Sequence, residues 1–106
     1  MDNDQLEEMF QAVAPISIRR MFGGKGIYSD GEIIAIWLRD RMLLKGDAEC
    51  AAQYEAQGGV QWTYQHNKTG KDVKMPYWSM PEIGWDDPDE MAQLARTALG
   101  AALRSR

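Results

Sequence analysis

The segment Ile16–Lys45, with the sequence ISIRRMFGGKGIYSDGEIIAIWLRDRMLLK, decides the fold class of this chain. Asp30-Gly31 near its middle is typical of a two-residue type I′ turn between antiparallel strands. The run that follows, Glu32–Leu38, is apolar on both faces, as expected of a central strand. With further turns at Gly23-Gly24-Lys25 and Arg39-Asp40, the segment predicts four strands, or three if the first two merge into one bent strand. The expected strands are Ser17–Phe22, Gly26–Ser29, Glu32–Leu38 and Met42–Lys45.

A helix is expected on each side of this segment. Near the N-terminus, Asp4 and Glu7 have the spacing of a capping box, and Pro15 ends the helix because its ring breaks the hydrogen-bond ladder. The apolar residues that recur there with helical spacing are Leu6, Met9, Phe10 and Val13. After the strands, Asp47 is the expected N-cap of a second helix over Ala48–Gln57.

A second hairpin is expected after the second helix. Val60, Trp62 and Tyr64 alternate with polar residues, which predicts a strand with one apolar face turned to the core. Asn67–Gly70 is typical of a hairpin loop, and Pro76 interrupts backbone donation near the end of the returning strand.

The last helix has the strongest signals in the sequence. Asp87 is the expected N-cap, Pro88 occupies the first helical position, and Glu90 completes a capping box. The apolar stripe of this helix consists of Met91, Leu94, Ala95, Ala98, Leu99, Ala102 and Leu103. The sequence therefore predicts one α+β domain over residues 1–106, an antiparallel sheet with flanking helices in the order α-β(3–4)-α-β(2)-α.

Composition indicates a soluble globular protein, because 44% of the residues are hydrophobic and 26% are charged. The longest apolar run, Ile33–Leu38, is far shorter than the roughly 20 residues of a membrane span. The acidic N-terminus lacks the apolar segment of a secretory signal, and a single cysteine suits a reducing compartment, so we expect a cytoplasmic protein without membrane contact. The net charge of −4 argues against strong autonomous binding to DNA.

No catalytic constellation is visible in the sequence. Cys50 and His66 are the only residues of their types, and neither lies in a nucleophile motif. The stretch Gly23–Gly26 lacks the spacing of a phosphate-binding loop, so its glycines are expected to serve a tight turn. The acidic residues around Asp87 are explained by helix capping. We therefore expect no enzymatic activity, no cofactor and no metal.

Two groups of residues are candidates for binding. The basic residues that a nucleic acid would contact are Lys68, Lys71 and Lys74 in the second hairpin, with Arg19, Arg20 and Lys25 as a second cluster. The neighbouring rings of Trp62 and Tyr64 are expected to be buried, which weakens this hypothesis. The segment Tyr77, Trp78 and Met80, between two prolines, is expected either to cap the core or to form a protein-interaction patch.

The residues Met21–Gly31, together with Pro76–Glu82 and Asp87–Met91, resemble the signature of the TfoX/Sxy N-terminal domain family. The positions that carry the resemblance are Phe22, Gly23, Gly24, Gly26, Tyr28, Asp30, Gly31, Pro76, Pro81, Asp87 and Pro88. The similarity extends from about Asp4 to Leu103. It implies an α+β fold similar to the secretion-chaperone-like folds, and it brings no catalytic or ligand-binding residues with it.

Long members of this family regulate competence genes together with the cyclic-AMP receptor protein, and they carry a second, helical domain. The sequence ends at Arg106, after the first domain, so competence regulation itself transfers poorly. We expect a non-enzymatic regulatory module that acts by protein–protein contact and forms a homodimer. A nucleic-acid-binding accessory domain that uses the Lys68–Lys74 hairpin is the alternative, and a small-ligand binder or enzyme involving Cys50 or His66 is a third.

Overall fold

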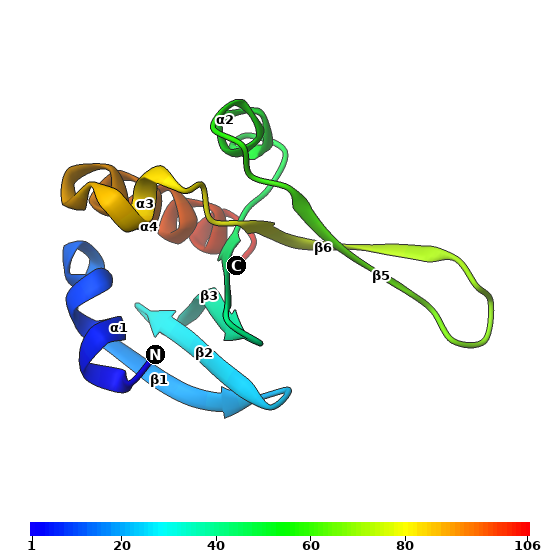
Figure 1. Cartoon of the computed structure of the whole chain (residues 1–106), viewed down its shortest axis with the longest axis horizontal. Coiled ribbons are helices and arrows are strands. Elements are labelled where there is room, and N and C mark those ends of the chain that lie inside the picture. The colour runs from blue at the N-terminus through cyan, green and yellow to red at the C-terminus, as the bar shows by residue number, and fades with distance from the viewer.

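Residues 16–45 form four consecutive antiparallel strands in the computed structural model, which describes residues 1–106. They belong to a six-stranded antiparallel sheet with the order β1-β2-β3-β4-β6-β5 (Figure 1). The strands are β1 (Ile16–Met21), β2 (Gly24–Ser29), β3 (Glu32–Leu38), β4 (Arg41–Lys45), β5 (Gln61–Gln65) and β6 (Asp72–Ser79). The helices are α1 (Asn3–Met9), the 3-10 turn η1 (Gln11–Val13), α2 (Ala51–Ala56), α3 (Ile83–Asp86) and α4 (Pro88–Arg104). The α+β class and the predicted order of elements are confirmed, with η1 and α3 as short additions.

Two-residue turns join the first four strands. Both central residues have positive φ in each turn, at 52° and 76° in Phe22-Gly23, 54° and 78° in Asp30-Gly31, and 50° and 61° in Arg39-Asp40. This is the type I′ pattern, whose twist matches that of antiparallel strands. The turn expected at Gly23-Gly24-Lys25 therefore lies one residue earlier. Gly24 already belongs to β2, where a Cβ atom would collide with the carbonyl oxygen of Trp37 on β3.

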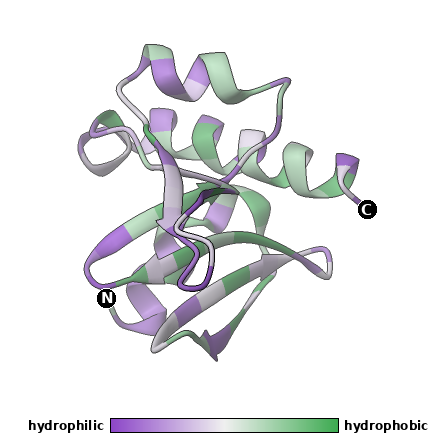
Figure 2. Ribbon diagram, turned by 90° about the vertical axis from the view of Figure 1, so that its right-hand side faces the viewer, coloured by the Kyte–Doolittle hydropathy of each residue, from purple (hydrophilic) through white to green (hydrophobic).

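The main core lies between the sheet and α4. Ile27, Ala35, Leu44 and Trp78 stand side by side across β2, β3, β4 and β6, and all but the last are fully shielded from solvent. Leu94, in the middle of α4, packs into the same cluster and is 1% exposed. The helical spacing of the last segment therefore places most of its apolar stripe on the sheet as predicted. The exceptions are Leu103, which is 36% exposed, and Ala101, which lies outside the predicted stripe and is fully buried. Figure 2, turned by 90°, shows α4 running above the strands to the C-terminus.

Helix α4 begins as the sequence predicts. The Asp87 Oδ1 atom accepts hydrogen bonds from the backbone N–H groups of Asp89 at 2.9 Å and Glu90 at 3.3 Å. Glu90 does not complete the box, because the Asp87 N–H already donates to the carbonyl of Ile83 in the preceding helix α3. The hydrogen bond that Glu90 would have made in the capping box is thus replaced by a backbone hydrogen bond to α3.

The other two predicted caps are displaced. Helix α1 is capped by Asp2, in a box with Gln5, and not by Asp4 with Glu7. Asp2 accepts from the Gln5 N–H and so starts the helix two residues earlier, and sequence spacing does not distinguish the two candidate caps. Asp47 accepts from the N–H groups of Glu49 and Cys50, so it caps the turn ahead of α2, which itself begins only at Ala51.

The β5–β6 hairpin projects from the body of the molecule as an arm (Figure 1). We call residues 61–75 the arm. The alternation of Val60, Trp62 and Tyr64 does mark a strand, but the expectation that this face is buried is wrong. Val60 is 66% exposed, Tyr64 is 46% exposed, and Trp62 is half-buried. The period-2 pattern is correct, but no helix or second sheet lies over the arm to cover it.

Candidate functional site

One face of the sheet is covered by no helix. The buried residues Ile36, Leu43 and Tyr77 form a small cluster separate from the main core, and every residue packed against this cluster lies on a strand. The two faces alternate along β4, where Met42 and Leu44 belong to the main core and Leu43 to the small cluster. We call this side of the sheet the helix-free face.

Cationic side chains lie over aromatic rings on the helix-free face. The Arg19 guanidinium is 4.9 Å from the centroid of the Tyr28 ring, and the Lys45 ammonium group is 5.3 Å from that of Tyr77. Arg41 stands on the same side of β4 as Lys45. A cation held over a ring keeps its charge available to another molecule, since the ring contact does not neutralise it.

Charge is divided unevenly between the strands and the rest of the chain. Nine of the twelve Lys and Arg residues lie on strands or on the turns between paired strands, against four of the sixteen Asp and Glu residues. Two of those four, Asp30 and Glu32, are paired with Arg106 at 3.5 and 2.9 Å. All ion pairs within the chain belong to Arg104 and Arg106, so the nine strand cations are unpaired. The acidic net charge of the chain therefore comes from the helices and the segments that flank them, and not from the strands.

A groove of about 350 Å³ opens beside the arm on the helix-free face. Phe22 at the tip of the β1–β2 turn is 71% exposed, and Trp62 packs edge-on against Tyr77 with ring centroids 6.3 Å apart. The groove is lined by Phe22, Leu38, Arg39, Trp62, Tyr64 and Met75. Sequence reasoning missed this site because it assigned the rings to the core. The uneven distribution of charge along the chain was the signal available for finding this face.

The segment Tyr77, Trp78 and Met80 is core and not an exposed patch. These side chains are 6%, 4% and 7% exposed, and burial raises the pKa of Tyr77. The Trp78 indole N–H donates to Glu55 at 2.9 Å, and its ring lies 6.0 Å from that of Tyr54, which fixes α2 on the sheet. Of the two expectations for this segment, core capping describes the three side chains. The interaction hypothesis fails for them because they are covered within a single chain.

The residues proposed to contact nucleic acid are not brought together in one patch. Lys68, Lys71 and Lys74 are exposed on the arm, which projects away from the part of the molecule that holds β1 and β2 (Figure 1). Lys25 is tied to the N-terminus, where its ammonium group donates to the Met1 carbonyl at 3.1 Å and to Asn3 Oδ1 at 2.8 Å. Arg20 follows Arg19 on β1 and therefore points to the opposite face of the sheet, because neighbouring residues of a strand point to opposite faces. Its cross-strand neighbour on β2 is Lys25. The two basic clusters are therefore separate.

The two candidate reactive residues do not line the groove and lie on different parts of the chain. Cys50 is buried beside the Asp47 turn, and burial raises the pKa of its thiol, which disfavours the reactive thiolate. His66 is exposed at the tip of the arm, where its Nδ1 atom accepts from the Lys68 N–H at 3.3 Å. Neither residue has the base, acid or orienting partner that nucleophilic catalysis requires.

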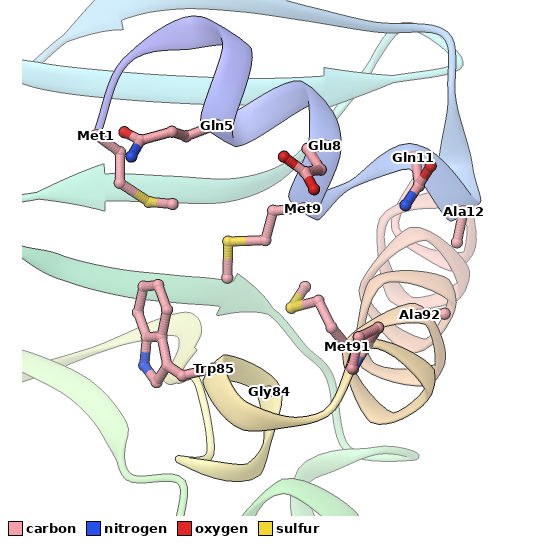
Figure 3. A pocket seen from close by; sticks show the side chains of 11 residues that line it. Met1, Gln5, Glu8, Met9, Gln11, Ala12, Gly84, Trp85, Met91 and Ala92 are labelled. Carbon is pink, nitrogen blue, oxygen red and sulfur yellow. The ribbon is translucent and has the colours of Figure 1, made fainter.

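A second cavity, also of about 350 Å³, lies between α1 and the start of α4 (Figure 3). The side chains of Met9, Met91 and Trp85 lie around it in the figure. Its polar side chains are those of Gln5, Glu8 and Gln11, and only Glu8 among them is ionisable. The residues that line it are Met1, Gln5, Glu8, Met9, Gln11, Ala12, Gly84, Trp85, Pro88, Met91 and Ala92.

The signature residues serve turns, close packing and caps. Gly26 lies under the side chain of Met21, Pro81 is fully buried, and Asp87-Pro88 starts α4. None of the helices combines the length and apolar character needed to cross a bilayer. Among curated proteins, no relative matches this chain. The TfoX N-terminal domain matches it over residues 8–102, which is nearly its whole length, and the chain belongs to the TfoX N-terminal domain family.

Proposed function

We propose that the chain is a non-enzymatic regulatory module that acts by protein–protein contact through its helix-free face and works as a homodimer. The observation that carries the proposal is this face itself, which combines an apolar groove with the unpaired cations Arg19, Arg39, Arg41 and Lys45. Its groove is lined by Phe, Leu, Arg, Trp, Tyr and Met, of which the aromatic residues, Met and Arg are the types enriched at protein interfaces. The family is not one of known enzymes, which agrees with this class of function.

The groove and its rim favour a partner segment with both apolar and acidic side chains. An apolar side chain in the groove would displace water from Leu38, Trp62 and Met75. Carboxylates beside it would meet Arg39 and Arg41, and neither guanidinium has an ion-pair partner in the chain. Such pairing gives specificity and a faster association, while burial in the groove supplies most of the affinity.

The setting we propose for this contact is transcription regulation in the cytoplasm, of the kind in which TfoX/Sxy proteins control competence. The support is the family membership and the resemblance of the Met21–Gly31 signature. The chain's own role is to supply a recognition surface. A recognition surface needs no reacting groups, in keeping with the placement of Cys50 and His66 outside the groove.

The test is a capture experiment from the native extract with nuclease present. The Arg41→Glu variant reverses one charge on the helix-free face, and Arg96→Glu makes the same change on the exposed side of α4. We expect the protein captured by the natural chain to be retained by Arg96→Glu and lost from Arg41→Glu. Equal capture by all three chains would refute contact through this face.

A second candidate function, nucleic-acid binding by the arm, is favoured by one observation. The arm exposes Tyr64 together with Lys68, Lys71 and Lys74, and rings beside cations can stack on bases while the cations meet phosphates. Capture that disappears on nuclease treatment would favour this candidate, because a direct protein contact does not need nucleic acid.

A further inference from the structure

We propose that two copies of the chain pair through the outer edges of β5, antiparallel about a two-fold axis at Thr63. The inference deepens the homodimer of the proposed function by naming its contact. It concerns the edge of the sheet, whereas partner binding is assigned to the helix-free face. The two claims can therefore fail separately.

The outer edge of β5 has free backbone hydrogen-bonding groups. β5 is the last strand of the sheet and pairs only with β6. At its two ends, the carbonyl of Val60 accepts from the Ser79 N–H and the His66 N–H donates to the Lys71 carbonyl, both at 2.8 Å. Because successive residues of a strand turn their backbone groups to opposite edges, even positions bond to β6 and Gln61, Thr63 and Gln65 face outward.

The sequence of β5 is nearly palindromic, which suits self-pairing. Gln61-Trp62-Thr63-Tyr64-Gln65 reads almost the same in both directions. About an axis at Thr63, each Thr63 bonds to its symmetry mate and each Gln61 to a partner Gln65. These are the outward-facing positions, so the backbone groups meet in register. Trp62 then lies opposite a partner Tyr64 in the closer, non-hydrogen-bonded pairing, and cross-strand aromatic pairs stabilise a sheet.

Little in β5 guards this edge from another strand, because the register shift between Gln61 and Thr63 places its extra residues on β6 and not on β5. Natural edge strands are guarded by charged residues, prolines or bulges that twist them away. The opposite edge of the sheet, β1, carries Arg19 and Arg20, which would face like charges in an antiparallel self-pair. β5 has no charged residue and no proline. Of the two open edges, β5 is therefore the one suited to a second copy.

The arm also needs support that a single chain does not provide. A two-stranded hairpin in water is marginally stable, and three or more strands with an apolar face are needed for stability of its own. Pairing two arms gives a four-stranded ribbon. A two-fold axis perpendicular to the sheet keeps Trp62 and Tyr64 of both copies on one face, so the two grooves become neighbours on one surface.

Sedimentation equilibrium of the purified chain tests the proposal, with concentrations up to about 100 μM because a small interface is expected to be weak. The natural chain should approach twice its mass of 12.0 kDa. Thr63→Glu should weaken association by about tenfold, because like charges then meet across the axis. Within one chain, the new carboxylate stands opposite Lys74 on β6, and this pair of opposite charges stabilises the hairpin. Ser17→Glu on the β1 edge should leave the dimer intact. A natural chain that stays monomeric, or a dimer lost in Ser17→Glu and kept in Thr63→Glu, would overturn the proposal.

Oxidative cross-linking tests the register independently. Two Thr63 residues in a hydrogen-bonded pair have Cα atoms about 5.5 Å apart, which suits a disulfide. Thr63→Cys should form a linked dimer on mild oxidation, whereas Ser17→Cys should not, and the native Cys50 is buried and should not compete. Failure of Thr63→Cys to link would contradict pairing about Thr63. A monomeric Thr63→Glu variant that still captures the protein partner would show that the proposed function stands apart from the dimer.

Discussion

Leu94 is the residue on which the packing of α4 depends most. It lies in the centre of the apolar stripe and is almost fully shielded from solvent by the sheet. Leu94→Ala should therefore lower the free energy of unfolding by roughly 2–5 kcal/mol, through lost burial and the cavity left behind. Leu103 on the same helix is 36% exposed, so Leu103→Ala is the matched control with a smaller loss. Urea denaturation of both variants is the measurement, and equal losses would contradict the helix register.

Asp47 links the start of α2 to the end of α4 and should make stability depend on pH. The hydrogen bond from Arg104 lowers the pKa of its carboxyl from 3.8 to about 2, and burial opposes this only partly. The Arg104 Nε atom lies 2.7 Å from Asp47 Oδ2. A carboxyl with a lowered pKa binds its proton more weakly in the folded state. Its contribution is therefore complete above pH 3.8 and is lost as the pH falls toward 2.

The measurement is the free energy of unfolding across that acidic range for the natural chain and for Asp47→Asn. The variant should show a smaller fall in stability, because it lacks the titrating group. Arg104→Gln should flatten the curve in the same way, since it removes the partner of Asp47. Parallel curves for the natural chain and both variants would show that this pair does not couple folding to protonation.

At the scale of elements, the start of α4 depends on one side chain. Asp87 satisfies two backbone N–H groups of the first turn. Asp87→Ala should cost about 1 kcal/mol of unfolding free energy, as the loss of an N-cap typically does. Asp86→Ala, one residue earlier, is the control and should leave the melting temperature nearly unchanged. An unchanged melting temperature for Asp87→Ala would show that the cap is not needed.

Local chemistry in the sequence predicts the elements well. Asp30-Gly31 is a dipeptide that favours a type I′ turn and forms one, and Asp87-Pro88 gives the last helix. Arg39-Asp40 also forms a turn, although Arg rarely adopts positive φ. Caps with several nearby acidic residues are predicted less well, as in α1, because Asp2 and Asp4 offer the same chemistry. The alternation of apolar and polar residues also predicts that β5 is a strand with one apolar and one polar face. It does not predict that the arm stands clear of the body, because periodicity reports two faces of a strand and not what lies over them.

In the whole molecule, the basic and acidic residues of each segment can be counted from the sequence, but which cations lie near one another depends on the order of the strands in the sheet. The strand cations come from segments far apart in the chain, and only the pairing of β4 with β6 brings the arm next to the first four strands. The groove forms at that junction. Sequence reasoning therefore identified the family and most elements, but the interaction patch it considered, Tyr77, Trp78 and Met80, is buried at the same junction.

Binding to nucleic acid should be weak at physiological salt. The chain has a net charge of −4, and its basic residues are divided between the arm, the helix-free face and the N-terminal side. Fluorescence anisotropy with a random-sequence duplex at about 150 mM salt should show affinity no tighter than non-specific binding, roughly 10⁻⁴–10⁻⁶ M. Lys68→Glu should change this affinity for the duplex only a little. Sub-micromolar affinity that Lys68→Glu abolishes would instead establish the arm as a nucleic-acid site.

Site-specific photocross-linking in the native cell tests whether the chain works by protein contact through its helix-free face. A photoreactive phenylalanine analogue would replace Phe22, which is 71% exposed beside the groove, or Trp85, which is 44% exposed on the helical side. Contact through the helix-free face predicts a discrete, nuclease-resistant protein adduct from position 22 and none from position 85. Adducts from position 85 alone, or adducts at position 22 that consist only of nucleic acid, would contradict it.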